Sequence, residues 1–185
     1  MPKSGMSFRS FLAVCTAVVF SALPVQAASD YLLVLDGIPG EATDEQHPRS
    51  IEIHSFSIGA SNAGSLAGGA GAGKVSFSDL SLSKSLDKAS PLLYLHCAQG
   101  KHIPTATLYV RKSGSDKVVE YYSIKLSEVQ VTSVQTSGSA GGGQPSEAIS
   151  LNFAKIEFSY QAQKPDGSLE SPVKAGWDLA ENKPI

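Results

Sequence analysis

The stretch "AISLNFAKIEFSYQA", Ala148 to Ala162, is the longest alternating run in the chain. Apolar residues occupy positions 149, 151 and 153, which is the spacing of a half-buried β-strand. The same spacing then resumes one position late, at 156, 158 and 160. A strand that switches phase once is expected to bend or bulge at the switch. We therefore predict one long, bent strand in which Phe158 faces the core and Lys155 faces solvent.

Several segments that precede this strand also have strand patterns. "SIEIHSFSI" (50–58) and "KVSFSDLSLSKSL" (74–86) each alternate and switch phase, and "YLLVL" (31–35) is a short apolar strand. "TLYVRK" and "KVVEYYSIKL" flank Ser113 to Asp116, which predicts a hairpin that "EVQVTSV" extends. Repeated phase switches favour a mainly β protein, with bent antiparallel sheets forming a β-barrel-like domain.

One flanking α-helix interrupts the strands, in "SPLLYLHCAQG". Ser90 is the expected N-cap, Pro91 stands at the first helical position, and Gly100 fits the left-handed C-terminal position. The segment is apolar on most sides, so we expect the helix to pack against the sheet.

The first 27 residues have the composition of a secretory signal peptide. Lys3 and Arg9 precede the apolar run "FLAVCTAVVF" (11–20), and "VQA" (25–27) supplies small residues for cleavage. The run is shorter than the roughly 20 residues that span a bilayer, which disfavours a membrane anchor. We therefore expect residues 1–27 to be removed, leaving one domain at 28–185 that is secreted or periplasmic and not inserted in a membrane.

The charge and cysteine content of the mature chain exclude several classes of function. Without Lys3 and Arg9, 13 basic side chains remain against 17 acidic ones, a formal net charge of −4. This sign argues against nucleic-acid binding, which depends on neutralising phosphates. Cys97 becomes the only thiol, so no intramolecular disulfide can form. Most often such a cysteine is a small buried hydrophobe, and a disulfide between chains is the alternative.

Three motifs resemble catalytic or ligand-binding sites, and none is convincing. "GGAGAGKV" (68–75) matches the G-x-x-x-x-G-K pattern of a phosphate loop, but Val75 replaces the required hydroxyl and a strand pattern follows. Two Ser-x-x-Lys pairs begin at Ser81 and Ser85, yet in a strand positions three apart lie on opposite faces. The four histidines are scattered without metal-ligand spacing. We expect no catalytic residue, no metal site and no cofactor.

The glycine-rich segment 59–73 still requires an explanation. Fixing its backbone would cost on the order of 15–30 kcal/mol. Leu66 is its only large apolar side chain, and burying it returns about 2 kcal/mol. The loop therefore either stays mobile or becomes ordered against a neighbouring molecule.

Several segments together resemble the haemolysin-coregulated protein (Hcp) family, the tube subunits of bacterial type VI secretion. They are "DYLLVLDGIPGEATDEQH", "GAGKVSFSDLSLSKSLDKASPLLYLHCAQGKH", "ATLYVRKSG", "SLNFAKIEFSY" and "SPVKAGWDL". The resemblance covers residues 30–185 and implies hexameric rings that stack and deliver effectors, without enzymatic activity. It makes Ser57 a candidate lumen-facing residue, although the family's two tryptophans around it are replaced here. It also makes 59–73 a candidate ring-stacking loop, with Gly59, Leu66, Gly68, Gly69, Gly71 and Gly73.

The signal peptide departs from the family pattern, because family tubes assemble in the cytoplasm. Three hypotheses remain open. The chain is an exported ring protein that keeps the family's assembly, together with type VI components and effector partners. Alternatively, it is an exported Hcp-like binding protein or effector outside any contractile tube. A remote alternative is an exported serine hydrolase.

Overall fold

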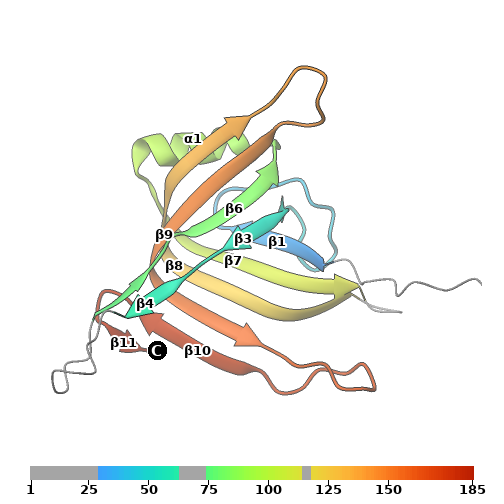
Figure 1. Ribbon diagram of the computed structural model, residues 1–185, viewed down its shortest axis with the longest axis vertical. Helices are drawn as coiled ribbons and strands as arrows, with labels where there is room; N and C mark the ends of the chain where they lie inside the picture. Colours follow the sequence, from blue (N-terminus) through green and yellow to red (C-terminus); the bar gives the residue numbers. More distant parts are fainter. Residues whose placement is uncertain (1–28, 63–73, 114–117) are drawn as a thin grey trace, which may run out of the picture.

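Long antiparallel strands dominate the structure, a computed structural model that describes residues 29–62, 74–113 and 118–185 (Figure 1). The elements are β1 (Ser29–Leu35), β2 (Ile51–Ile53), β3 (Ser55–Ser57), β4 (Ala60–Asn62), β5 (Val75–Phe77), β6 (Leu80–Ser85), α1 (Ser90–Gln99), β7 (His102–Ser113), β8 (Val118–Ser137), β9 (Ser146–Tyr160), β10 (Val173–Asp178) and β11 (Lys183–Pro184). The mainly β class with one flanking helix is confirmed for these residues, as is the hairpin of β7 and β8.

The sheet is organised around β9, the strand that the longest alternating run predicted. One edge of β9 pairs with β8 along nearly its whole length. The other edge is divided, because β6 pairs with residues 146–151 and β10 pairs with residues 155–160. Beyond β8 the order continues through β7 and β1 to β2. The sheet therefore splits along one edge of β9, with β6 and β10 leaving in different directions (Figure 1).

The segment from Ile51 to Ser57 brings the two ends of the sheet together. Its first part, β2, pairs with β1, and its second part, β3, pairs with β6. The change of partner occurs at His54, whose N–H donates to Ser83 O at 2.8 Å. The expected phase switch in this segment is therefore a break between two strands. The same applies to 74–86, where β5 pairs with β4, and β6 begins after two residues that belong to neither strand. The result is a curled, barrel-like sheet.

Strands β7, β8 and β9 bend at the same position across the sheet, and we call this bend the corner. On each strand two residues, instead of one, separate successive buried side chains: Ile103 and Ala106, Leu126 and Val129, and Phe153 and Ile156. The register pairs Ile103 with Val129 and Val129 with Phe153. Glu128, at the centre of this level, has a φ of 53°. The three strands bend together, so the buried residues on both sides belong to one core.

The corner confirms the predicted phase switch of β9 but corrects the expected roles of two residues. Phe158 is only half-buried and stacks on Tyr122, with ring centroids 6.4 Å apart. Lys155 is exposed as expected, yet its Nζ lies 3.0 Å from Oδ2 of Asp178, whose side chain is 3% exposed. Hydrogen bonds from the Glu181 backbone and from Lys155 lower the pKa of Asp178. Lys155 therefore neutralises a buried carboxylate.

Helix α1 ends as predicted but begins differently. Gly100 takes the left-handed conformation, with φ 60°, and its N–H bonds to carbonyl oxygens of the last turn. Ala89 occupies the N-cap position without a side-chain bond, so the prediction that Ser90 caps the helix is wrong. Ser90 is buried, and its hydroxyl is engaged by other side chains described below. Leu93 packs in the core, whereas Tyr94 and Leu95 remain exposed, so the helix covers the sheet with one side only.

Candidate functional site

Ser57, the candidate lumen-facing residue, is exposed at the end of β3. Its neighbours Phe56 and Ile58 are half-buried and pack against the core, which leaves the serine on the opposite face of the strand. Ser57 pairs with Ser81 of β6, and Ser81 pairs with Ser150 of β9. The residue that the family resemblance singled out thus belongs to a row of hydroxyl groups across three strands.

Further serines extend this row into a face, which we call the serine face. Its members are Ser55, Ser57, Ser81, Ser83, Ser85, Ser146 and Ser150. Ser55 Oγ and Ser83 Oγ lie 2.7 Å apart, and Ser85 Oγ lies 2.8 Å from His54 Nε2. The only lysine of β6, Lys84, turns away from this face and is fully buried. The serine face therefore offers neutral hydrogen-bonding groups.

Sequence reasoning identified Ser57 alone, although the signal for the whole face is present. In "LSLSKS" (80–85), serine recurs at 81, 83 and 85 and alternates with the buried Leu80, Leu82 and Lys84. Period-2 serines on the polar phase of a strand indicate one hydroxyl-bearing face. That β3 and β9 add their serines to the same face depends on strand pairing, which the sequence did not supply.

Of the candidate ring-stacking loop, 59–73, the structure describes residues 59–62, and Ala60–Asn62 form β4, which pairs with β5, instead of belonging to the loop. Gly59 is exposed; its N–H donates to Ser78 Oγ at 2.9 Å, and its carbonyl accepts the Ser78 N–H at 2.9 Å. The other candidate residues, Leu66, Gly68, Gly69, Gly71 and Gly73, lie outside the described residues. After Lys74 the chain enters β5 and not a helix. The rejection of a phosphate loop is thereby supported, because no helix N-terminus follows the glycines.

The Ser-x-x-Lys pair that begins at Ser81 does not form a catalytic dyad. Ser81 is exposed whereas Lys84 is fully buried, so the two side chains lie on opposite faces as expected. Lys84 Nζ instead contacts Glu147 Oε2 at 2.8 Å and Ser90 Oγ at 3.0 Å. Ser90 Oγ in turn donates to Glu147 Oε2 at 2.5 Å. This serine is 3% exposed and the other two residues are more deeply buried, so no substrate reaches the cluster.

The histidines and the cysteine form no recognisable metal site. Among the residues that the structure describes, no group of three or more His, Cys, Asp and Glu could hold a metal ion. Cys97 is half-buried and packs against the core, close to the expected role of a small hydrophobe. Burial lowers the pKa of His96, and the nearby positive charge of Lys101 lowers it further. Within the same residues, no helix is long and apolar enough to cross a membrane.

Comparison with known proteins identifies the family. The family profile described as "Type VI secretion system effector, Hcp" matches residues 31–160. "Protein hcp1" of Pseudomonas aeruginosa is 43% identical over 158 residues, which cover 84% of this chain and 98% of that protein. The chain therefore belongs to the Hcp family of the type VI secretion system, as its sequence segments indicated.

Solved structures agree with this assignment. A type six secretion system protein has a TM-score of 0.79 at 32% identity, covering 85% of this chain and 100% of its own. Hcp1 from Salmonella typhimurium has a TM-score of 0.71 at 34% identity, covering 85% and 99%. The chain is thus a type VI secretion protein of the tube and effector family, with the fold of that family.

Proposed function

We propose that the mature chain is an exported, non-enzymatic tube subunit that assembles into hexameric rings, with Ser57 and the serine face toward the lumen. Family membership over most of the chain supports this proposal. The observation that carries the assembly is apolar surface that the single chain leaves uncovered. In a ring, the head-to-tail contact of identical subunits would cover such surface and close by rotation.

The clearest uncovered surface lies where β9 ends and β10 begins. Tyr160 and Val173 pair across these strands and are 48% and 71% exposed. The Tyr121 ring meets the Tyr160 ring edge-on, with centroids 6.4 Å apart. We call Tyr121, Tyr160 and Val173 the tip patch. Exposed side chains of this size, gathered at one place, are typical of an interaction surface.

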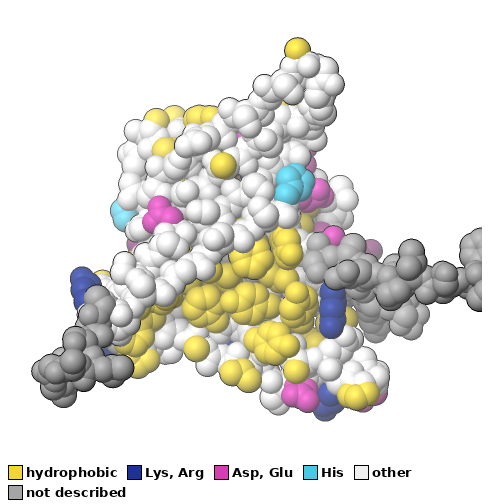
Figure 2. Space-filling model, in the orientation of Figure 1, with side chains coloured by type: hydrophobic (Ala, Val, Ile, Leu, Met, Phe, Trp, Pro, Cys, Tyr) yellow, Lys and Arg dark blue, Asp and Glu magenta, His cyan; other side chains and the backbone are white. Residues whose placement is uncertain are grey.

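A second apolar area lies on the face shown in Figure 2. Hydrophobic side chains gather there below the band formed by β3 and β4 and above β10. The fold explains this opening, because β6 and β10 diverge from the same edge of β9. Half-buried aromatic side chains, including Phe56, Phe77 and Phe158, pack against the core without being covered by it. A neighbouring subunit would remove this surface from water.

Sedimentation of the purified protein at micromolar concentration tests the assembly. We expect a species of six chains, and we expect Val173→Lys to shift it toward smaller species because a charge would enter the interface. Val34→Lys is the matched control, since Val34 is a 39% exposed strand valine outside the tip patch. A wild-type monomer under all conditions would contradict the ring. It would favour the alternative, an exported Hcp-like binding protein or effector outside a tube.

Export itself predicts a new N-terminus at Ala28. Residues 25–27 fit the small-residue rule for signal cleavage, and the family match begins only at residue 31. Mass spectrometry of the protein recovered outside the cytoplasm should find a chain beginning at Ala28. Recovery of a chain that retains Met1 or Met6 would disprove processing and remove the reason to place assembly outside the cytoplasm.

A further inference from the structure

A cavity of about 520 Å³ lies beside β1 and β2, and no tip-patch residue lines it. Asp30 of β1 and Glu52 of β2 line it, together with His54. Ala42 and Asp44, from the segment between β1 and β2, form its opposite wall, and Arg111 of β7 also lines it. Its volume is within the range of about 300–1,000 Å³ that is usual for ligand sites.

The wall of this cavity is fixed in place by charged contacts. Arg111 is 5% exposed, and its Nη1 donates to Asp44 Oδ2 at 2.5 Å. Asp44 Oδ1 accepts the His47 backbone N–H at 2.8 Å, and His47 Nε2 lies 2.9 Å from Glu120 Oε2. The hydrogen bond from Arg111 is the main reason that the pKa of Asp44 is lowered. The cavity is therefore a built feature and not a gap beneath a loose loop.

A second cavity of about 390 Å³ adjoins the first, because Ala42, Glu52 and His54 line both. It adds Glu41 and Asp87 to the lining. The two cavities form one groove along β2, which we call the acidic groove.

Part of the negative charge in the acidic groove is not held in an ion pair. Asp44 is paired with Arg111, and Asp87 with Lys84 at 2.8 Å. The side chains of Asp30 and Glu52 make no hydrogen bond or ion pair with another described residue, although Arg111 lies opposite Asp30 in the pairing of β1 with β7. Glu41 accepts only the Lys88 backbone N–H, at 3.1 Å.

Arg111, which lines the first cavity, carries a buried polar atom without a partner in the described part of the chain. Its Nε is buried and lacks a hydrogen-bond partner among the described residues. A buried donor of this kind favours an acceptor that a small movement can bring to it. The unpaired carboxylates of the groove attract positively charged groups, and the Nε–H of Arg111 needs an acceptor such as a carbonyl oxygen. A peptide with basic side chains combines both groups, whereas a simple cation provides only the first.

We infer that the acidic groove binds an extended basic peptide segment, with one ammonium or guanidinium group between Asp30 and Glu52 and a second near Glu41. Two adjoining cavities that share Glu52 suit two basic side chains of one segment. A carboxylate that pairs with a bound cation gains a charge-assisted hydrogen bond. The inference does not depend on the ring. The second cavity includes Ser85 of the serine face, but Asp30, Glu41 and Glu52, which carry the negative charge, belong to neither the serine face nor the tip patch.

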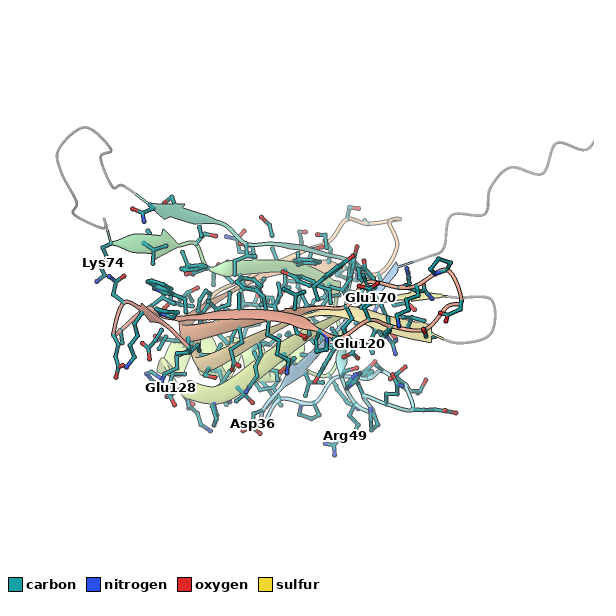
Figure 3. All side chains as sticks on the ribbon, turned by 90° about the horizontal axis from the view of Figure 1, so that it is seen from below. Asp36, Arg49, Lys74, Glu120, Glu128 and Glu170 are labelled. Atoms are coloured by element: carbon teal, nitrogen blue, oxygen red, sulfur yellow. The ribbon has the colours of Figure 1, made fainter. Side chains whose placement is uncertain are left out.

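Calorimetric titration of the purified full chain with acetyl-Lys-Ala-Lys-Ala-amide tests the inference. We expect saturable binding that weakens as salt is added, and no binding of the matched acetyl-Gln-Ala-Gln-Ala-amide. Glu52→Gln should weaken binding about tenfold or more, as the loss of a charged hydrogen bond implies. Glu128→Gln is the matched control, because Glu128 is a 64% exposed carboxylate that lines neither cavity. It also lies well away along β8 from Glu120, whose contact with His47 supports the wall of the groove (Figure 3).

Each outcome of this titration decides the question. Loss of binding in Glu52→Gln but not in Glu128→Gln supports the groove, provided that both variants melt at the wild-type temperature. Equal binding of the two peptides would overturn the inference, as would equal weakening by both substitutions. Absence of saturable binding to the lysine peptide would overturn it as well, whatever the oligomeric state found by sedimentation.

Discussion

Replacing Lys84 with methionine should destabilise the chain by about 3–5 kcal/mol, the usual cost of leaving one member of a buried ion pair alone. Lys84 is fully buried, and its Nζ contacts both Glu147 Oε2 and Asp87 Oδ1 at 2.8 Å. Without the ammonium group, the carboxylate of Glu147, only 1% exposed, would stay in the core without its counter-charge. Because Ser90 and Thr136 also donate to this carboxylate, the loss would loosen the contact between α1, β8 and β9.

Urea denaturation at one fixed protein concentration measures this cost, with Trp177 as the probe. Trp177 is the only tryptophan and packs half-buried against the core, so its emission should report unfolding. Lys125→Met is the matched control: its ion pair with Glu157 is 49% exposed on both sides, and such pairs contribute at most about 1 kcal/mol. The double variant Lys84→Met with Glu147→Gln should be more stable than Lys84→Met alone. Additive losses would show that the two charges do not depend on each other.

The pair also predicts a pH dependence. Burial acts to raise the pKa of Glu147, but hydrogen bonds from Lys84, Ser90 and Thr136 outweigh it, and the pKa is lowered below 4.5. A lowered carboxyl pKa stabilises the folded state above the unfolded pKa and loses this contribution as pH falls through the folded one. The stability difference between wild type and Glu147→Gln should thus stay constant from neutral pH to about pH 5. It should shrink below pH 4.5, the ordinary carboxyl pKa. A difference that changes near neutral pH would contradict this assignment.

Local signals in the sequence predicted most of the strands and the end of the helix. Gly100 marks the helix end because only the local backbone decides whether a left-handed residue is needed there. The alternation of apolar and polar residues located β9 and its phase switch, because this signal is also local. The switches in 50–58 and 74–86 were visible too, but they are breaks where the chain changes partner. Periodicity reports which side chains are buried and not which strand lies alongside.

Contacts between distant residues were beyond the sequence signals. Serine is a favoured N-cap residue, but the Ser90 hydroxyl instead donates a hydrogen bond to Glu147, which lies 57 positions away in the sequence. The Asp44–Arg111 and His47–Glu120 contacts join residues 67 and 73 positions apart, and none of them stands in a motif. Ser57 was found only through family resemblance, and the rest of the serine face followed from strand register. Polar pairs inside a curled sheet are fixed by pairing geometry, which one sequence does not specify.

The corner in β9 gives the second large expected effect, in a comparison of two phenylalanines on the same strand. Phe153 precedes the corner, is 4% exposed and meets the Phe77 ring edge-on, with centroids 6.1 Å apart. Phe158 follows the corner and is half-buried. Removing a buried phenylalanine side chain leaves a cavity and costs about 3–5 kcal/mol. We expect this cost for Phe153→Ala, and about half of it for Phe158→Ala because less apolar area leaves water there.

The same urea experiment separates the corner from a strand that alternates without interruption. Uninterrupted alternation from Phe153 would place Lys155 and Glu157 in the core and Phe158 on the surface, so Phe158→Ala would cost almost nothing. Glu157→Thr is the control, since an exposed position on the strand tolerates a residue that favours β structure. A large loss for Glu157→Thr with no loss for Phe158→Ala would place the corner elsewhere. We expect the loss of stability to be largest for Phe153→Ala, smaller for Phe158→Ala and smallest for Glu157→Thr. This order requires the two residues that separate Phe153 from Ile156, because they form the corner that turns the whole sheet around its core.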